Sequence, residues 1–164
     1  MVEGYAFYLA HHHENPYWVY HIYMPIEYGL LAIIFSYWQK KPWMKRALRL
    51  SIPIFMLICI WDLVIFGNLD DLNYFTASVA FTLYVGISSF TLLYLQTDNP
   101  HSIIKDCRFW VSAALLIYSA GGLAYFSFHK TVVSDILVEI WAIHSALNII
   151  AYVLYSIGII CQTR

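Results

Sequence analysis

The hydrophobic residues of this chain fall into five long runs that short polar segments separate. The runs cover about residues 17–38, 48–66, 75–95, 109–128 and 136–160. A helix needs about 20 apolar residues to cross a hydrocarbon core of about 30 Å, and each run is close to that length. The runs do not alternate as the strands of a membrane β-barrel do, and a helix satisfies its own backbone in lipid. The pattern therefore predicts an all-α integral membrane bundle of five helices.

Composition agrees with lipid as the solvent of this chain. Hydrophobic residues make up 61% of the sequence and charged residues 12%, with a net charge of −1. Soluble domains are about 45–50% apolar and about 25% charged. The small net charge gives no reason to expect nucleic-acid binding. We expect residues 1–16 to be an extracytoplasmic N-terminal segment without a signal peptide, and residues 17–164 to form a single transmembrane domain.

The distribution of basic residues predicts the orientation of the bundle. If the N-terminus lies outside, the outer loops contain only Lys130, whereas the inner side carries eight basic residues: Lys40, Lys41, Lys45, Arg46, Arg49, Lys105, Arg108 and Arg164. Cytoplasmic loops are enriched in Lys and Arg, so the C-terminus is expected in the cytoplasm. The basic segment Lys40–Arg49 predicts a surface for a cytoplasmic signalling partner or for anionic lipid.

Ionisable side chains inside the spans locate a candidate binding site, because such groups are costly in lipid and indicate function. At about 1.5 Å per residue, His21 and Asp62 lie about 6 Å from the outer surface, His144 about 12 Å and Glu27 about 15 Å. Glu139 is expected near that surface. The predicted ligand-binding residues, which should converge in the outer half of the bundle, are His21, Glu27, Asp62, His144, Asn148 and Tyr152.

Three helices carry polar or small residues at steps of three and four, which places each set on one helix face. In the fifth run, we expect the polar face to point into the bundle; it contains Trp141, His144, Ser145, Asn148, Tyr152 and Tyr155. In the third and fourth runs, small residues predict close helix packing; they are Ser78, Thr82, Gly86 and Ser89, then Ser112, Ser119, Gly121 and Gly122.

Several of these residues also have structural explanations that remain open. His144 and Asn148 can be a hydrogen-bonded contact between helices, His21 can cap its helix, and His11–His13 can be a polar surface segment. The thiols of Cys107 and Cys161 are expected at the inner ends of the fourth and fifth spans, where a reducing cytoplasm disfavours a structural disulfide. Acylation of either thiol is an alternative.

The function predicted from these features is a non-enzymatic membrane sensor or regulatory module. Its outward-facing polar pocket would bind a small ligand, an ion or a proton. HExxH, P-loop and GxSxG motifs are absent from the sequence, as is a lysine inside a span for a retinal Schiff base. One alternative is a small proton- or ion-coupled transporter or channel subunit. Another is a b-type cytochrome in which His21 and His144 are the axial ligands of haem b. A homo-oligomer is compatible with each.

Two sequence stretches resemble segments of a family of bacterial polytopic membrane proteins with five to seven helices. They are HENPYWVYHIYMPIEYGLL and IWAIHSALNIIAYVLYSIG, with the patterns H-x-Y-x-P-I-E and W-x-I-H-S-x-x-N. The resemblance covers about a quarter of the chain and brings no established activity. It implies a bacterial inner membrane, and it implies that this chain lacks an N-terminal helix pair present in longer members.

Overall fold

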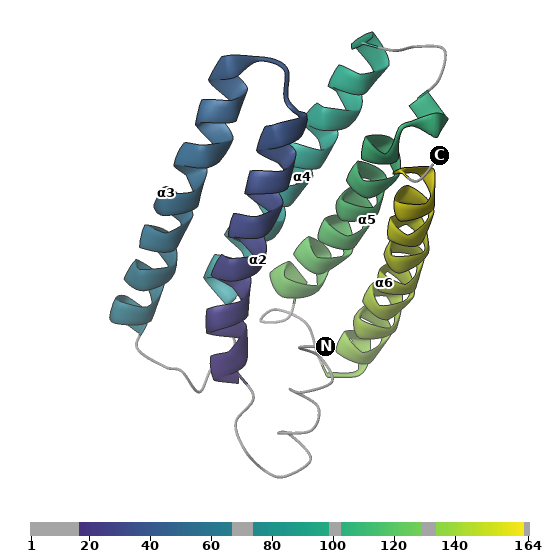
Figure 1. Cartoon of the computed structure of the whole chain (residues 1–164). Helices are drawn as coiled ribbons and strands as arrows, with labels where there is room; N and C mark the ends of the chain where they lie inside the picture. The colour runs from purple at the N-terminus through teal and green to yellow at the C-terminus, as the bar shows by residue number, and fades with distance from the viewer. Residues whose placement is uncertain (1–16, 67–73, 99–102, 129–133, 163–164) are drawn as a thin grey trace. The chain divides into compact units, whose positions relative to one another are not determined.

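The computed structural model describes residues 17–66, 74–98, 103–128 and 134–162, and these residues are almost entirely helical. The elements are α2 (Tyr17–Trp38), α3 (Pro42–Phe66), α4 (Tyr74–Asp98), the short 3₁₀ helix η1 (Ile103–Lys105), α5 (Cys107–Phe128) and α6 (Ser134–Gln162) (Figure 1). Five helices are long and apolar enough to cross a membrane, and the described residues contain no strand. The predicted five-helix membrane fold is therefore confirmed. The predicted segment 1–16, with His11–His13, lies outside the described residues.

The largest difference in helix bounds is at α3, which begins at Pro42 rather than near Leu48. Proline suits the first position of a helix, because its φ is preset and the N–H it lacks would have no partner there. The carbonyl of Lys41 accepts hydrogen bonds from the backbone N–H of Met44 at 3.2 Å and of Lys45 at 3.3 Å. Most of the basic segment is thus the first two turns of α3. An apolar run predicts the part of a helix that lies in hydrocarbon, and the helix itself extends beyond it.

The chain forms two compact units that divide after Ala80. In the first unit, α2 and α3 run antiparallel and side by side, joined by residues 39–41 (Figure 1). The buried Tyr28 of α2 donates a hydrogen bond to Ser51 Oγ at 2.7 Å, and its ring lies 4.4 Å from that of Phe55. Ser51 in turn donates to the carbonyl of Leu48 at 2.7 Å. Each polar group in this contact has a partner, which is required where water is excluded.

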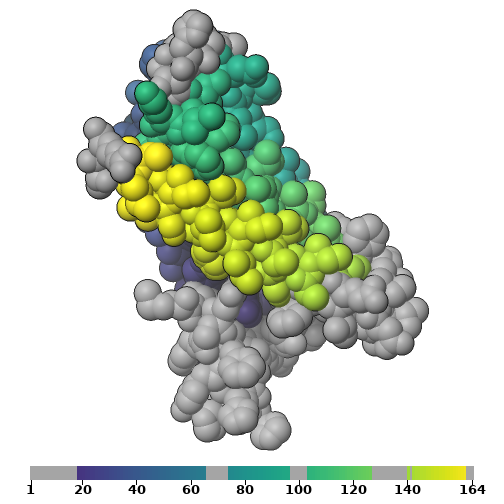
Figure 2. All heavy atoms as spheres, turned by 90° about the vertical axis from the view of Figure 1, so that its right-hand side faces the viewer, coloured from purple at the N-terminus to yellow at the C-terminus, as the bar shows by residue number. Residues whose placement is uncertain are grey.

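The second unit contains α4 from Phe81 onward, η1, α5 and α6. Here α5 and α6 form an antiparallel hairpin with extensive contact (Figure 1). Figure 2 looks onto α6. This helix carries several large exposed apolar side chains: Ile143, Ile149, Ile150, Val153, Ile159 and Ile160. A helix face of this composition suits contact with lipid tails.

The small residues predicted to pack are buried on α5, whereas two of the four predicted on α4 are exposed. Ser112, Ser119, Gly121 and Gly122 are buried on α5. On α4, Thr82 and Gly86 are exposed, and a Cβ on Gly86 would meet nothing within 4 Å. The buried face of α4 instead carries Ala77, Phe81, Tyr84, Ser88, Thr91 and Leu95. The prediction was therefore wrong for Thr82 and Gly86. The buried face of α4 combines small residues with large ones, and the ring of Phe81 occupies the space beside Gly122.

Asp106 caps the start of α5, where the first backbone N–H groups lack partners within the helix. Its carboxylate accepts a hydrogen bond from the backbone N–H of Arg108 at 2.9 Å and from the guanidinium at 2.6 Å. These hydrogen bonds, chiefly those from the guanidinium, hold the pKa of Asp106 below its usual value although partial burial opposes the shift. The contact fixes the end of the helix at which Cys107 lies.

Candidate functional site

His144 and Asn148 of α6 form a hydrogen-bonded pair one helical turn apart. Asn148 Nδ2 lies 3.3 Å from His144 Nε2, so the amide donates when the imidazole carries its proton on Nδ1. The carbonyl oxygen of Asn148 is buried and accepts no hydrogen bond from the part of the chain that the structure describes. A buried acceptor without a donor costs about 1–3 kcal/mol. This oxygen is therefore a favourable point of attachment for a ligand group or water that donates a hydrogen bond.

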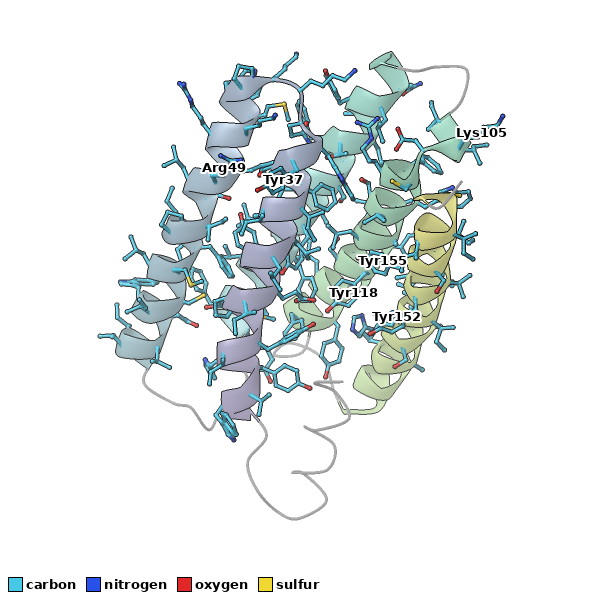
Figure 3. All side chains as sticks on the ribbon, viewed as in Figure 1. Tyr37, Arg49, Lys105, Tyr118, Tyr152 and Tyr155 are labelled. Atoms are coloured by element: carbon cyan, nitrogen blue, oxygen red, sulfur yellow. The ribbon has the colours of Figure 1, made fainter. Side chains whose placement is uncertain are left out.

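Residues of α5 enclose the imidazole of His144. The ring of Tyr125 stacks on it with centroids 5.7 Å apart and planes 17° apart, and Tyr118 lies at 6.3 Å. A Cβ on Gly121 would come within 3.2 Å of His144 Nδ1, so glycine is needed there for the ring to approach α5. Tyr118, one of these neighbouring residues, is labelled in Figure 3. The pair thus lies in the contact between α5 and α6.

This geometry does not favour the haem alternative at His144. An iron ligand needs one ring nitrogen directed at open space, with iron about 2 Å away. Asn148 Nδ2 lies 3.3 Å from Nε2, and a Cβ on Gly121 would lie 3.2 Å from Nδ1, so both ring nitrogens are close to other protein atoms or positions. Separately from haem, no group of three or more His, Cys, Asp or Glu side chains among the described residues is placed to hold a metal ion.

Tyr152 departs from the inward face that we predicted for α6. Its side chain is 58% exposed, whereas the neighbouring Ala151 is buried. An α-helix has 3.6 residues per turn, so steps of four residues drift around the axis by about 40° each. The contact face runs from His144 and Asn148 to Ala151 and Gly158, and Tyr152 lies beside it. Trp141 and Glu139 lie in α6, but their side chains are outside the described set.

In the first unit, Asp62 of α3 lies buried against the start of α4. The hydroxyl of Thr76 donates a hydrogen bond to Asp62 Oδ2 at 2.7 Å, and both side chains are almost completely buried. The ring of Trp61 meets that of Phe75 edge to face at 5.9 Å, next to this bond. The sequence indicated Asp62 as a site residue but did not indicate its partner.

Glu27 and His21 are both partly buried on α2. Glu27 accepts a hydrogen bond from the hydroxyl of Tyr23 at 3.0 Å, along the i,i+4 direction of the helix. Because α2 and α3 are antiparallel, the start of α2 and the end of α3 lie at the same end of the first unit. His21, near the start of α2, and Asp62, near the end of α3, therefore share that end.

The predicted site thus resolves into two sets of residues in two units. His144 and Asn148 are together in the second unit, whereas Asp62, Glu27 and His21 belong to the first. Convergence of the two sets remains a prediction. The residues that sequence reasoning missed are contacts between helices, chiefly Thr76 and Tyr125. The sequence did contain a signal for Thr76. Thr76 lies near the start of one span and Asp62 near the end of the preceding span, so both are expected at the same side of the membrane.

Comparison with known proteins identified no relative of this chain. No protein family, no curated protein and no solved structure matches this chain. The resemblance to bacterial polytopic membrane proteins therefore rests on the two sequence motifs alone. The membrane-spanning fold, by contrast, rests on the five helices themselves.

Proposed function

We propose that this protein is a non-enzymatic sensor module of a bacterial inner membrane, and that His144 and Asn148 bind a proton or a small polar ligand. The observation that carries the proposal is the buried carbonyl oxygen of Asn148, next to an imidazole in an apolar helix contact. The two side chains together offer donors and acceptors to a small ligand. Histidine also changes charge near neutral pH more readily than other side chains do.

The position of the pair in the helix contact supports transmission of a signal. The imidazole stacks on Tyr125 and lies against Gly121, so a charge or ligand at His144 acts on α5 as well as on α6. A ligand shifts a conformational equilibrium only as far as it binds one arrangement better than the other. A protonated imidazole next to a Gly121 backbone and a tyrosine face differs in energy from a neutral one. The α5–α6 hairpin is therefore the element that would move.

The output side of this proposal is the basic segment at the start of α3. Lys40, Lys41, Arg46 and Arg49 are exposed there. The guanidinium of Arg49 lies 5.7 Å from the centre of the Tyr37 ring, and Figure 3 shows the two labelled side chains next to each other. A surface of this charge suits an acidic partner. The proposed partner is a cytoplasmic signalling protein, with the N-terminus of this chain outside and the C-terminus inside.

The proton is the first probe for the site. In nanodiscs between pH 5 and 8, the difference in Tm between the wild type and His144→Gln should change with pH, because only the wild type has an imidazole at this position that can gain a proton in this range. A change of 1 kcal/mol corresponds to about 2–4 °C for a chain of this size. His21→Gln, in the other unit, is the matched control. A difference in Tm that is constant across this range would mean that His144 has only a structural role.

The orientation can be tested independently of the ligand. Reporter fusions at Met44 and at Asp70 should report opposite sides of the membrane, with Met44 in the cytoplasm. The expectation follows from the excess of basic residues around Met44. Both reporters on one side would contradict the five-span topology. Met44 outside would leave the fold intact and would remove the cytoplasmic partner from the proposal.

Transport is the second candidate function, and the buried carboxyl of Asp62 favours it. Buried acidic groups in membrane spans commonly relay protons, and Asp62 is 6% exposed. Proton flux into proteoliposomes separates the two proposals. Flux that is lost in Asp62→Asn and in Glu27→Gln would replace the sensor by a transporter, whereas a sensor gives no flux above empty vesicles.

A further inference from the structure

Two cysteines lie at the open end of the α5–α6 hairpin, where α5 begins and α6 ends. Cys107 is the first residue of α5, and Cys161 lies in the last turn of α6. Both are free thiols with partial exposure. They are also the terminal residues of their candidate membrane spans, Cys107–Phe126 and Ala142–Cys161. Their position is therefore at the edge of the hydrocarbon, within reach of water-soluble reagents.

Contacts elsewhere in the hairpin determine which residues of α5 and α6 face each other. At one level, a Cβ on Gly121 would lie 2.8 Å from Leu147 Cδ1. At another, a Cβ on Gly158 would lie 3.0 Å from Val111 Cγ2 and 3.4 Å from Trp110 Cβ. The number of residues from Leu147 to Gly158 on α6 equals the number from Gly121 back to Trp110 on α5. The register is thus that of two antiparallel helices without a shift.

The same register places Cys161 opposite Cys107. Cys161 follows Gly158 by three residues, and Cys107 precedes Trp110 by three, so each shares the contact face of its helix. The backbone already meets here, because a Cβ on Gly158 would lie 3.5 Å from the carbonyl oxygen of Cys107.

We infer that Cys107 and Cys161 form a redox-active thiol pair that is reversibly oxidised to an intrachain disulfide, closing this end of the hairpin. The oxidant is a small disulfide such as oxidised glutathione. The thiolate of one cysteine attacks a sulfur of that disulfide, forms a mixed disulfide and releases one reduced thiol. The second cysteine, as thiolate, then displaces the other thiol. In total, two protein thiols lose two protons and two electrons, and the small disulfide gains them.

Close helix approach makes this bond geometrically accessible. A disulfide needs Cα atoms about 4.4–6.8 Å apart, a range that two helices reach only where small residues separate them. Gly158 provides that approach next to both cysteines. The bond would restrain the same two helices that hold His144 and Asn148, but its formation does not depend on what that pair binds.

Intact-mass and peptide analysis of the full chain in nanodiscs tests the inference. After treatment with excess oxidised glutathione, the wild type should lose two hydrogen atoms and yield a peptide linking Cys107 to Cys161. Reduced glutathione should reverse the change. Cys59→Ala, which removes the third thiol, should behave as the wild type does. Cys107→Ser and Cys161→Ser should each abolish the link, and the remaining cysteine should carry one glutathione instead.

The opposite outcome is equally clear. If both thiols react with an alkylating reagent but oxidised glutathione produces only mixed disulfides, the two cysteines do not face each other and the inference fails. A link that includes Cys59, or one between two chains, would overturn it as well. Gly158→Leu provides a geometric check, since its side chain should separate the helices. It should reduce intrachain linkage at least tenfold while leaving both thiols open to alkylation.

Discussion

Replacing Gly122 by alanine is expected to destabilise the protein by about 1–3 kcal/mol, the cost of overpacking a closed contact. A Cβ at this position would lie 2.6 Å from both Cε1 and Cζ of Phe81, and 2.9 Å from Cδ1. Those distances are well inside van der Waals contact, so the ring must move. It has little freedom to do so, because its centroid lies 5.5 Å from the rings of both Tyr118 and Phe126. Reversible unfolding in mixed micelles would measure the loss.

Gly86→Ala is the matched control for Gly122→Ala. A Cβ on Gly86 would meet nothing within 4 Å, although this glycine lies in α4 within a span as apolar as that of α5. Alanine is also the better helix former, by about 1 kcal/mol in water. The control should therefore leave stability unchanged or raise it slightly. Equal destabilisation by the two substitutions would show that the effect is not due to the Phe81 contact.

The number and extent of the helices could be predicted from the sequence because bilayer thickness imposes a length on each apolar run. The start of α3 could not be predicted in the same way. Its first two turns are rich in lysine and arginine and lie beyond the apolar run, yet Pro42 and the carbonyl of Lys41 begin the helix there. Hydropathy describes the solvent around a segment, whereas the hydrogen bonds at its ends determine where the helix begins.

The packing faces were harder to predict because two faces of one helix can have similar patterns. On α4, the small residues around Gly86 and the larger ones around Phe81 both recur at helical spacing. Which of them is buried depends on the complementary surface of another helix, here the space that Gly122 leaves on α5. That information is absent from the sequence of α4 itself.

In the candidate site, too, contacts within one helix could be predicted from the sequence, whereas contacts between helices could not. The hydrogen bond between His144 and Asn148 follows from their spacing of four residues in one helix, so the sequence could indicate it. The stacking of Tyr125 on His144 and the bond from Thr76 to Asp62 join different helices. Their formation depends on the register between helices, which hydrophobic periodicity does not determine. The sequence thus indicated the polar residues that are costly to bury in lipid, but not the side chains of other helices that contact them.

Removing the hydroxyl of Thr76 is expected to cost about 1–3 kcal/mol, because it leaves the buried carboxyl of Asp62 without that donor. Thr76→Val keeps the volume and the branching of the side chain while deleting the 2.7 Å hydrogen bond. Thr76→Ser keeps the hydroxyl and should cost less, although it removes a methyl group from a fully buried position. The measurement is again reversible unfolding in mixed micelles, with the two variants compared at one pH.

A double-mutant cycle separates the bond from the burial of its partners. Asp62→Leu removes the group that needs a donor, so Thr76→Val should cost much less in that background than in the wild type. Such couplings inside membranes average about 0.6 kcal/mol, because the separated helices also find partners for polar groups. A coupling well above this value is expected here, since Asp62 and Thr76 are 6% and 0% exposed. A coupling near zero would mean that another donor replaces the hydroxyl, and Asp62 would then be accessible to water or to a ligand.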